Sequence, residues 1–178
     1  HGGFLMYPKS IQKLVELFAH FPTVGRRSAA RFVFYLIKAS DEEIDELVGA
    51  IQALKKEIHL CQFCFNPFEA GEDMLLCSIC RDSRRNRSFL CIVEKESDLE
   101  ALEKTKSYEG VYFILGDAMN AVRKDDIKNI RRDELRERVE NPKNFGLESG
   151  GFEEIIIATN PTTEGEATAL YIERLLNT

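Results

Sequence analysis

Hydrophobic positions in the first third of the chain recur at helical spacing and predict three consecutive helices. The first apolar stripe falls within residues 11–18 and the second within residues 29–37, with a break at residues 21–25. A third stripe covers residues 44–58 and follows residues 40–43, which match a capping box. The simplest interpretation of three amphipathic helices in succession is a small helical core.

After residue 88 the pattern changes to short apolar runs that alternate with helical stretches. The predicted strands are residues 89–93, 111–115 and 155–159. The predicted helices are residues 97–104, residues 125–139 and a last helix that starts near residue 163, and residues 141–151 are predicted to be a loop. Strands that alternate with helices predict an α/β layer with a mainly parallel sheet.

The chain is therefore predicted to be a multidomain α/β protein. We expect a helical domain over residues 6–59, a cysteine-rich and basic segment over residues 60–88, and the α/β domain over residues 89–178. Residues 1–5 resemble the remnant of an expression tag, which makes Met6 the expected start. No apolar run approaches the roughly 20 residues of a membrane-spanning helix, so we expect a cytosolic protein.

The net charge of −6, from 24 basic and 30 acidic residues, conceals a marked asymmetry. Residues 1–38 hold six basic groups and one acidic group, residues 39–80 hold two and nine, and residues 81–88 hold four and one. A globally acidic protein is not attracted to nucleic acid as a whole, but its basic segments can still bind phosphate. Uneven charge is also compatible with a merely solvated surface.

Four cysteines form two closely spaced pairs, Cys61 with Cys64 and Cys77 with Cys80, separated by twelve residues. Each pair can place two thiolates on one ion, and the loop between the pairs can complete a tetrahedron. Two disulfides or unliganded core thiols are the alternatives, although a reducing cytosol disfavours disulfides. The spacing favours a structural zinc ion, and four thiolates leave no open position for catalysis. Cys91 reads as an ordinary buried thiol.

Arginines follow the tight turn between the first two predicted helices, at Arg26, Arg27 and Arg31. The start of a helix presents backbone N–H groups to a phosphate, and arginines beside it can bind neighbouring phosphates. A short hairpin between core helices is the alternative. The segment resembles a helix-hairpin-helix motif, a DNA-binding device without sequence preference, in which Thr23 replaces an expected loop glycine.

A second group of arginines directly follows the cysteines. Arg84, Arg85 and Arg87 are candidates for additional phosphate contacts, because a rigid metal site beside them would fix their positions. A solvated loop with local pairing to Asp82 explains the same residues, and both interpretations stay open.

Acidic residues follow the first and third predicted strands, at Glu94 and at Glu164 and Glu166. Parallel sheets place their sites at the carboxyl ends of strands, although capping of the following helix is the alternative role. The second segment resembles the Toprim motif of type IA topoisomerases and DnaG-type primases, in which two aspartates hold magnesium. Here Asn160 and Thr162 stand at those positions, and magnesium prefers carboxylate ligands. Phosphoryl transfer is therefore not expected, and weak metal binding or contact with an arginine of a partner protein stays open for Glu94 and Glu164.

The order of these motifs resembles the RecR family of bacterial recombination mediators. The resemblance runs from Met6 to Thr178, and its most specific points are Tyr7 and Pro8, residues 22–29, the four cysteines, and residues 91–94 and 158–171. It departs from the family at residues 116–123, where members have a Gly/Pro-rich loop, and after Thr178, where members continue through another short strand region.

The resemblance implies a non-enzymatic clamp that binds single- and double-stranded DNA without strong sequence preference. It also implies a ring-shaped tetramer in the cytoplasm at the nucleoid. With RecO and RecF, such a protein promotes loading of RecA onto single-stranded DNA coated with SSB, at gaps. The family's DNA-facing positions fall on Arg27 and Arg31, and its RecO-facing surface includes Glu94 and residues 160–166.

Two other functions fit parts of the sequence. A magnesium-dependent Toprim nuclease or primase-like enzyme would use Glu94 and Glu164. The uncharged residues Asn160 and Thr162 argue against such an enzyme. A zinc-stabilised protein-interaction module would make the DNA contacts incidental.

Overall fold

The computed structural model describes residues 7–71, 74–116 and 130–177. The tag remnant expected at residues 1–5, the divergent segment after Gly116 and the beginning of the helix expected at residues 125–139 lie outside the described residues. Contacts between Cα atoms divide the chain into two compact units, residues 1–56 and residues 57–178. Within the described residues, no helix combines the length and the apolar character needed to cross a bilayer.

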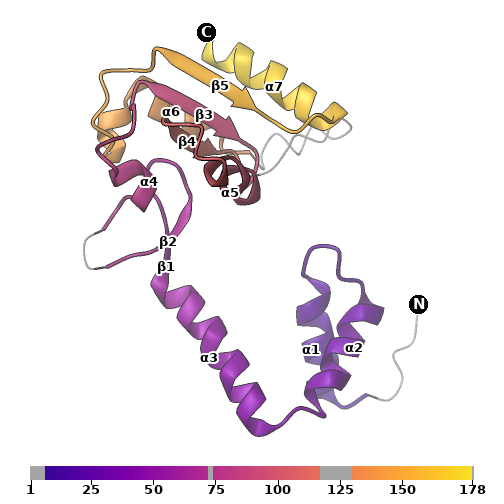
Figure 1. The fold of residues 1–178 in the computed structure, drawn as a ribbon. Helices are drawn as coiled ribbons and strands as arrows, with labels where there is room; N and C mark the ends of the chain where they lie inside the picture. The colour runs from indigo at the N-terminus through magenta and orange to yellow at the C-terminus, as the bar shows by residue number, and fades with distance from the viewer. Residues whose placement is uncertain (1–6, 72–73, 117–129, 178) are drawn as a thin grey trace. The chain divides into compact units, whose positions relative to one another are not determined.

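Helices α1 (Lys9–Ala19) and α2 (Arg26–Leu36) pack against each other in the first unit, as the spacing predicts (Figure 1). Their common core is small and consists of Val15, Ala29 and Val33, with half-buried apolar neighbours around them. The Phe18 ring packs edge-on against the rings of Phe21 and Phe32, with centroids 5.8 and 5.9 Å apart.

Helix α3 (Asp41–Glu57) forms where predicted, but its apolar stripe is not buried. The capping box is present, because the Ser40 backbone N–H donates to Glu43 (2.9 Å) and the Glu43 N–H donates to the Ser40 hydroxyl (3.3 Å). However, Ile51 and Leu54 are 55% and 60% exposed. The expectation that all three stripes form one core is wrong for the third, since periodicity gives a helix an apolar face without specifying what covers it.

The second unit begins with the cysteine-rich segment, which forms an antiparallel hairpin that the hydrophobic pattern does not predict. Strand β1 (Ile58–Leu60) pairs with β2 (Pro67–Glu69), and the four-residue helix α4 (Ser78–Arg81) follows. The Ile114 N–H donates to the Cys64 carbonyl (3.1 Å), so the segment is hydrogen-bonded to the main sheet.

The main sheet has three strands in the order β4-β3-β5, and both pairings are parallel, as predicted. Its strands are β3 (Phe89–Val93), β4 (Val111–Ile114) and β5 (Glu154–Ala158). Its helices are α5 (Glu96–Lys104), α6 (Arg132–Glu140) and α7 (Thr163–Leu176). A 3-10 turn, Pro142–Phe145, interrupts the predicted loop after α6. Helix α6 begins at Arg132, directly after Arg131, whose N–H and side chain donate to the Leu115 and Ile114 carbonyls at the end of β4.

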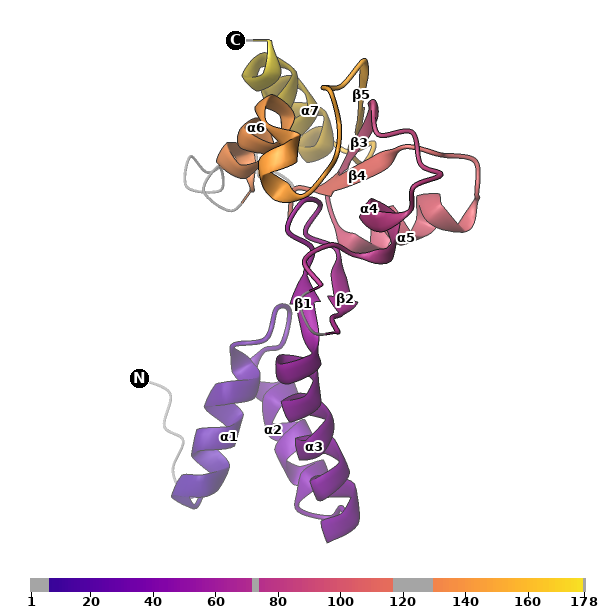
Figure 2. The same cartoon turned by 90° about the vertical axis from the view of Figure 1, so that its left-hand side faces the viewer.

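Helices lie on both sides of the sheet (Figure 2), and alternate residues of the strands belong to two different core clusters. Leu90 and Ile92 share a core with Leu135 of α6 and Ile172 of α7. Cys91, Val93, Tyr112 and Ile114 instead pack with Leu99 of α5. The sheet is therefore covered on both faces, which explains why its strands read as continuous apolar runs.

Gly165, in the first turn of α7, allows this helix to begin directly against the end of β5. A Cβ atom at this position would lie 2.0 Å from the Asn160 carbonyl oxygen, which belongs to the backbone and cannot rotate away. A Cβ atom added to Gly49 in α3 would meet no neighbouring atom within 4 Å.

We expect Gly165→Ala to destabilise the protein by about 1–3 kcal/mol, because overpacking at a fixed backbone contact forces the helix to move. Gly49→Ala is the matched control and should be neutral or stabilising by about 0.5–1 kcal/mol, since alanine favours a helix interior. Urea unfolding followed by circular dichroism measures both. Equal stability of the two variants would contradict the close approach.

Candidate functional site

The four paired cysteines meet in one cluster at the turn that joins β1 to β2. Their Sγ atoms all lie within 4.8 Å of one another, and all four residues are fully buried. The Sγ atoms of Cys64 and Cys77 are 3.6 Å apart. Thiolates around a tetrahedral zinc ion, with Zn–S bonds of about 2.3 Å, are expected about 3.8 Å apart. The cluster could therefore hold a metal ion, and its cysteines are free rather than disulfide-bonded.

Hydrogen bonds among the four thiols shift their pKa values in opposite directions. The hydrogen bond with Cys64, followed by those with Cys77 and Cys80, lowers the pKa of the Cys61 thiol. The hydrogen bond with Cys61 and the burial of the site raise the pKa of the Cys80 thiol. Four buried thiolates cannot coexist without a cation, and sulfur donors suit zinc far better than magnesium.

Local backbone bonds shape the turn that carries the first cysteine pair. The Phe65 N–H donates to the Cys61 carbonyl (3.0 Å), and the Cys61 N–H donates to the Asn66 carbonyl (3.0 Å). The Asn66 N–H also points at the Cys64 sulfur (3.4 Å). Phe65 adopts a left-handed conformation, with φ of 64°. The thiols are thus positioned by a tight turn of the chain.

The basic residues that follow the turn between α1 and α2 lie on the exposed side of α2. This helix begins at Arg26 after Gly25, its first turn holds no acidic residue, and no side chain caps it. Arg27 and Arg31 are exposed and lie one turn apart, opposite the buried Ala29 and Val33. The backbone N–H groups and both guanidinium groups can therefore approach the same anion.

Thr23 takes the turn conformation for which a glycine was expected. Its φ is 63°, in the left-handed region that a β-branched residue seldom adopts. The helical hairpin of α1 and α2 therefore forms with threonine at this position.

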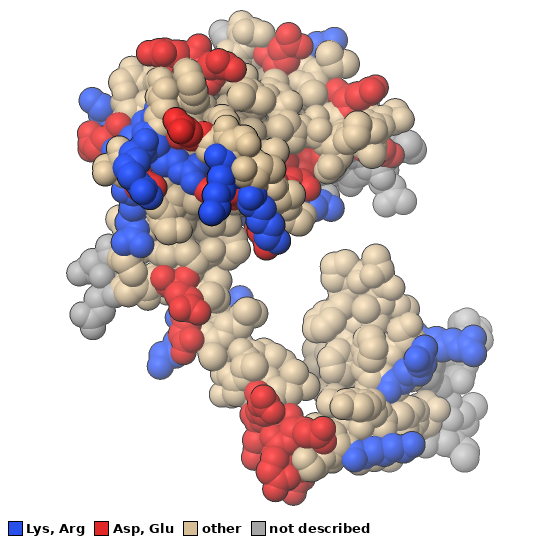
Figure 3. Space-filling view, viewed as in Figure 1, with Lys and Arg blue, Asp and Glu red and all other residues tan. Residues whose placement is uncertain are grey.

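Basic side chains lie on the surface of the helical unit, while acidic side chains gather at the start of α3 (Figure 3).

The arginines after the second cysteine pair differ in their surroundings. Arg84 is 87% exposed and pairs with Asp82, with Nη2 2.9 Å from Oδ2, and this bond lowers the Asp82 pKa to about 2. Arg85 is only 13% exposed; it donates to the carbonyls of Tyr108 (3.3 Å) and Gly110 (3.1 Å) and forms an ion pair with Glu103. Arg87 is half-buried. Of the three, Arg84 is the most accessible to a phosphate.

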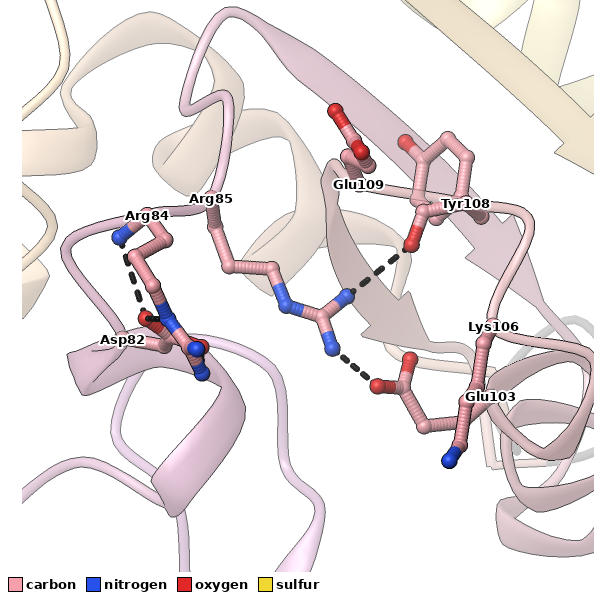
Figure 4. A pocket seen from close by; sticks show the side chains of 7 residues that line it. All are labelled: Asp82, Arg84, Arg85, Glu103, Lys106, Tyr108 and Glu109. Carbon is pink, nitrogen blue, oxygen red and sulfur yellow. Dashed lines mark hydrogen bonds and ion pairs between the residues drawn. The ribbon is translucent and has the colours of Figure 1, made fainter.

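The ion pair of Arg85 with Glu103 lies in an open hollow of about 500 Å³. Figure 4 shows the residues that line this hollow. Three cations and three anions line it together with one tyrosine, namely Asp82, Arg84, Arg85, Glu103, Lys106, Tyr108 and Glu109. The mixed charge selects neither an anionic nor a cationic ligand. Arg85 therefore serves to attach the loop to the turn before β4.

The carboxylate at the end of β3 is occupied by hydrogen bonds from the end of β5. Glu94 is 3% exposed; its Oε1 accepts from the Asn160 backbone N–H (3.1 Å) and its Oε2 accepts from the Asn160 side-chain amide (2.5 Å). Thr162 caps α7 by accepting from the Gly165 N–H (3.0 Å). The structure thus brings Glu94 and Asn160 together, while Glu164 and Glu166 lie exposed in the first turn of α7.

This pairing was not predicted from the sequence. The available signal was an amide at a position where the Toprim motif has a metal-binding carboxylate. An amide can donate a hydrogen bond to the neighbouring carboxylate, which an aspartate cannot do without a proton or a cation between them. Gly165, whose missing side chain keeps α7 close to both residues, was also not singled out.

We expect Asn160→Asp to destabilise the protein by about 1–3 kcal/mol, because it removes a donor and places a second negative charge beside a buried carboxylate. Added Mg²⁺ should restore part of the loss in the variant by bridging the carboxylates, and should leave the parent unchanged. The measurement is the thermal unfolding midpoint with and without Mg²⁺. Asn144→Asp, at an exposed position, controls for the added charge. Parent-like stability of Asn160→Asp would refute the pairing.

Comparisons with known proteins agree with this arrangement. The family model described as "Toprim domain" matches residues 88–178, and the model described as "RecR, helix-hairpin-helix" matches residues 11–55. Together they cover both the basic hairpin and the strand ends that hold Glu94 and Asn160.

Curated relatives extend the match over nearly the whole chain. The Recombination protein RecR of Paenarthrobacter aurescens is 39% identical over 171 residues, which is 96% of this chain and 80% of the relative. The Recombination protein RecR of Rubrobacter xylanophilus is 40% identical over 166 residues, or 93% of this chain and 77% of the relative. The corresponding protein of Magnetococcus marinus is 39% identical over 166 residues, with the same coverage. With its helical hairpin, its four-cysteine cluster and its Toprim domain in one chain, the protein belongs to the RecR family.

Proposed function

We propose that this protein is a non-enzymatic DNA-binding clamp that mediates recombination during DNA repair. Its relatives are named recombination proteins, and the observation that carries the proposal is the exposed pair Arg27 and Arg31 beside the uncapped start of α2. With RecO and RecF, the clamp promotes loading of RecA onto SSB-coated single-stranded DNA at gaps. Its place of action is the cytoplasm, at the nucleoid.

The basic helix binds the DNA backbone rather than the bases. Guanidinium groups and helix N-termini are typical phosphate ligands, and phosphates carry no sequence information. Single- and double-stranded DNA are therefore both bound, with little base preference. Arg26 adds to this surface from the first position of α2, and Arg84 is an additional contact because its side chain stays exposed.

Replacing both Arg27 and Arg31 by alanine should weaken DNA binding and leave folding intact, because both side chains are exposed. Each lost phosphate contact should lower the slope of log K against log salt by about 0.9 on duplex DNA. Fluorescence anisotropy at several salt concentrations measures both effects. Lys55→Ala with Lys56→Ala removes the same charge from exposed positions of α3 and serves as the control. The proposed interface is refuted by a double arginine variant that binds with the affinity and salt slope of the parent.

Zinc is the metal proposed for the tetracysteine cluster, with Cys61, Cys64, Cys77 and Cys80 as its ligands. The number and kind of donors and the Sγ separation support a closed structural site. When bound, the ion supplies folding energy, on the order of 10 kcal/mol for structural zinc in small domains. With zinc bound, these four cysteines stabilise the fold of the segment around residues 60–88.

The strand-end site is proposed to be catalytically silent and to serve as a binding face for RecO. Both oxygens of Glu94 accept hydrogen bonds from Asn160, and Thr162 caps a helix. A magnesium ion would have to displace these bonds without gaining a second carboxylate in return. The exposed Glu164 and Glu166 at the same edge suit a basic surface on a partner protein.

Self-association into a ring-shaped tetramer is proposed from the family and is supported by α3. No residue of this helix is buried, and its apolar stripe includes Leu47, Val48, Ile51 and Leu54, each more than 40% exposed. Large contiguous apolar surfaces are uncommon on monomeric proteins and mark interfaces. A second copy of the chain covers the stripe in this proposal.

Replacing Ile51 and Leu54 by glutamate should convert the assembly to a smaller species, because two charges cannot be buried in an apolar contact without a large penalty. Gln52→Glu introduces a charge at an exposed position on the same helix and should leave the mass unchanged. Size-exclusion chromatography with light scattering reports the mass directly. An unchanged mass of the double variant would place the interface elsewhere.

A further inference from the structure

Helix α6 sends one arginine, Arg138, into the fold beside the first cysteine pair. Its side chain is only 8% exposed. Its Nε donates to the carbonyls of Gln62 (3.2 Å) and Phe63 (3.1 Å), and its Nη2 also donates to the Gln62 carbonyl (3.1 Å). These two carbonyls belong to the residues between Cys61 and Cys64. A single guanidinium group therefore satisfies the outward-facing backbone of the metal-binding turn.

Two aromatic rings enclose this guanidinium group and limit its contact with water. Its Cζ lies 4.5 Å from the centroid of the Phe65 ring and 4.0 Å from that of the Phe145 ring. Its remaining nitrogen, Nη1, donates to the Glu134 carbonyl on its own helix (3.1 Å). The group is consequently held in one orientation by contacts with three separate parts of the unit.

Among the residues that the structure describes, no buried carboxylate forms an ion pair with Arg138. The one ion pair recorded for it joins Nη1 to a Glu137 oxygen at 3.9 Å, and the Glu137 side chain is 66% exposed. Glu134 is exposed as well, and the nearby Arg131, which stacks on Phe65, is itself a cation. Burying a cation without a counter-charge is strongly unfavourable because the cation loses its hydration. Such a residue is expected to face a negative charge elsewhere in the fold.

The tetracysteine centre provides that charge. A divalent metal bound by four thiolates has a net charge of −2, and this dianion would also be costly to bury alone. The two groups therefore offset each other's desolvation. Hydrogen bonds to the backbone beside metal ligands are known to orient those ligands and to tune their affinity.

We infer that Arg138 is a positioning residue of the metal centre, which supplies its counter-charge and fixes the Cys61–Cys64 turn to helix α6. The inference rests on the proposed zinc site and adds to it a direct coupling between the metal and the Toprim domain. Zinc retention depends on α6, and the order of α6 depends on zinc.

Zinc release to a chromogenic chelator from the full chain tests this coupling. We expect Arg138→Met to release zinc about 10- to 100-fold faster than the parent, the range typical for residues that support metal ligands. Arg138→Lys keeps the charge and should be intermediate, because a lysine cannot reach both carbonyls with a planar fork. Arg136→Gln, an exposed position on the same helix, should behave like the parent.

Two further measurements separate the role at the metal from a general loss of stability. In the cobalt-substituted protein, Arg138→Met should shift the thiolate-to-cobalt absorption bands, and Arg136→Gln should not. In the parent, zinc removal should increase hydrogen exchange in residues 132–140 together with residues 61–80. This second measurement needs no variant and decides the matter if Arg138→Met does not fold.

The outcomes distinguish the inference from the proposal on which it rests. Elemental analysis that finds no zinc in the purified parent overturns both. Zinc present in the parent, with parent-like release from a folded Arg138→Met variant, overturns the role of Arg138 alone. Unchanged exchange in residues 132–140 after zinc removal does the same.

Discussion

The cysteine cluster and one face of the parallel sheet share a single hydrophobic core. All four cysteines and Phe63 pack in the same cluster as Leu90, Ile92 and Phe113 of the sheet. The hydrogen bond from Ile114 to the Cys64 carbonyl joins the two parts through their backbones as well. Residues 57–178 therefore form one compact unit, and whatever stabilises the thiols also stabilises the sheet. The shape of the strand-end site thus depends on the chemistry of thiols that share its core.

Much of this architecture could be predicted from local patterns. The strands of the sheet are buried on both faces, so each reads as an uninterrupted apolar run with helices on either side. The cysteine spacing likewise predicts a cluster, because the pairs and the loop between them are encoded within twenty residues. Contacts between residues that are far apart in the sequence are harder to predict from local patterns. Arg84 and Arg85 are neighbours of identical chemistry, yet one is exposed and the other is buried against Tyr108 and Gly110.

The third helix shows a different limit. Its periodic stripe predicts an amphipathic helix over the correct residues, but the stripe stays exposed in the described chain. Hydrophobic periodicity reports that a face must be covered and carries no information about the covering surface. The pairing of Glu94 with Asn160 was missed for a related reason, since the two residues follow different strands and are far apart in the sequence. It converts a strand end that would otherwise suit a cation into an internal structural bond.

The small core of the amino-terminal unit has a consequence for the behaviour of the protein in solution. Only Val15, Ala29 and Val33 are buried in its core cluster among the described residues, and a domain of about 60 residues is marginally stable even with an ordinary core. Under the proposed self-association, neighbouring subunits supply the missing contacts by mass action. Folding of the amino-terminal unit and assembly would then become one equilibrium, so dilution would lower the amount of folded helical hairpin even though no residue has changed.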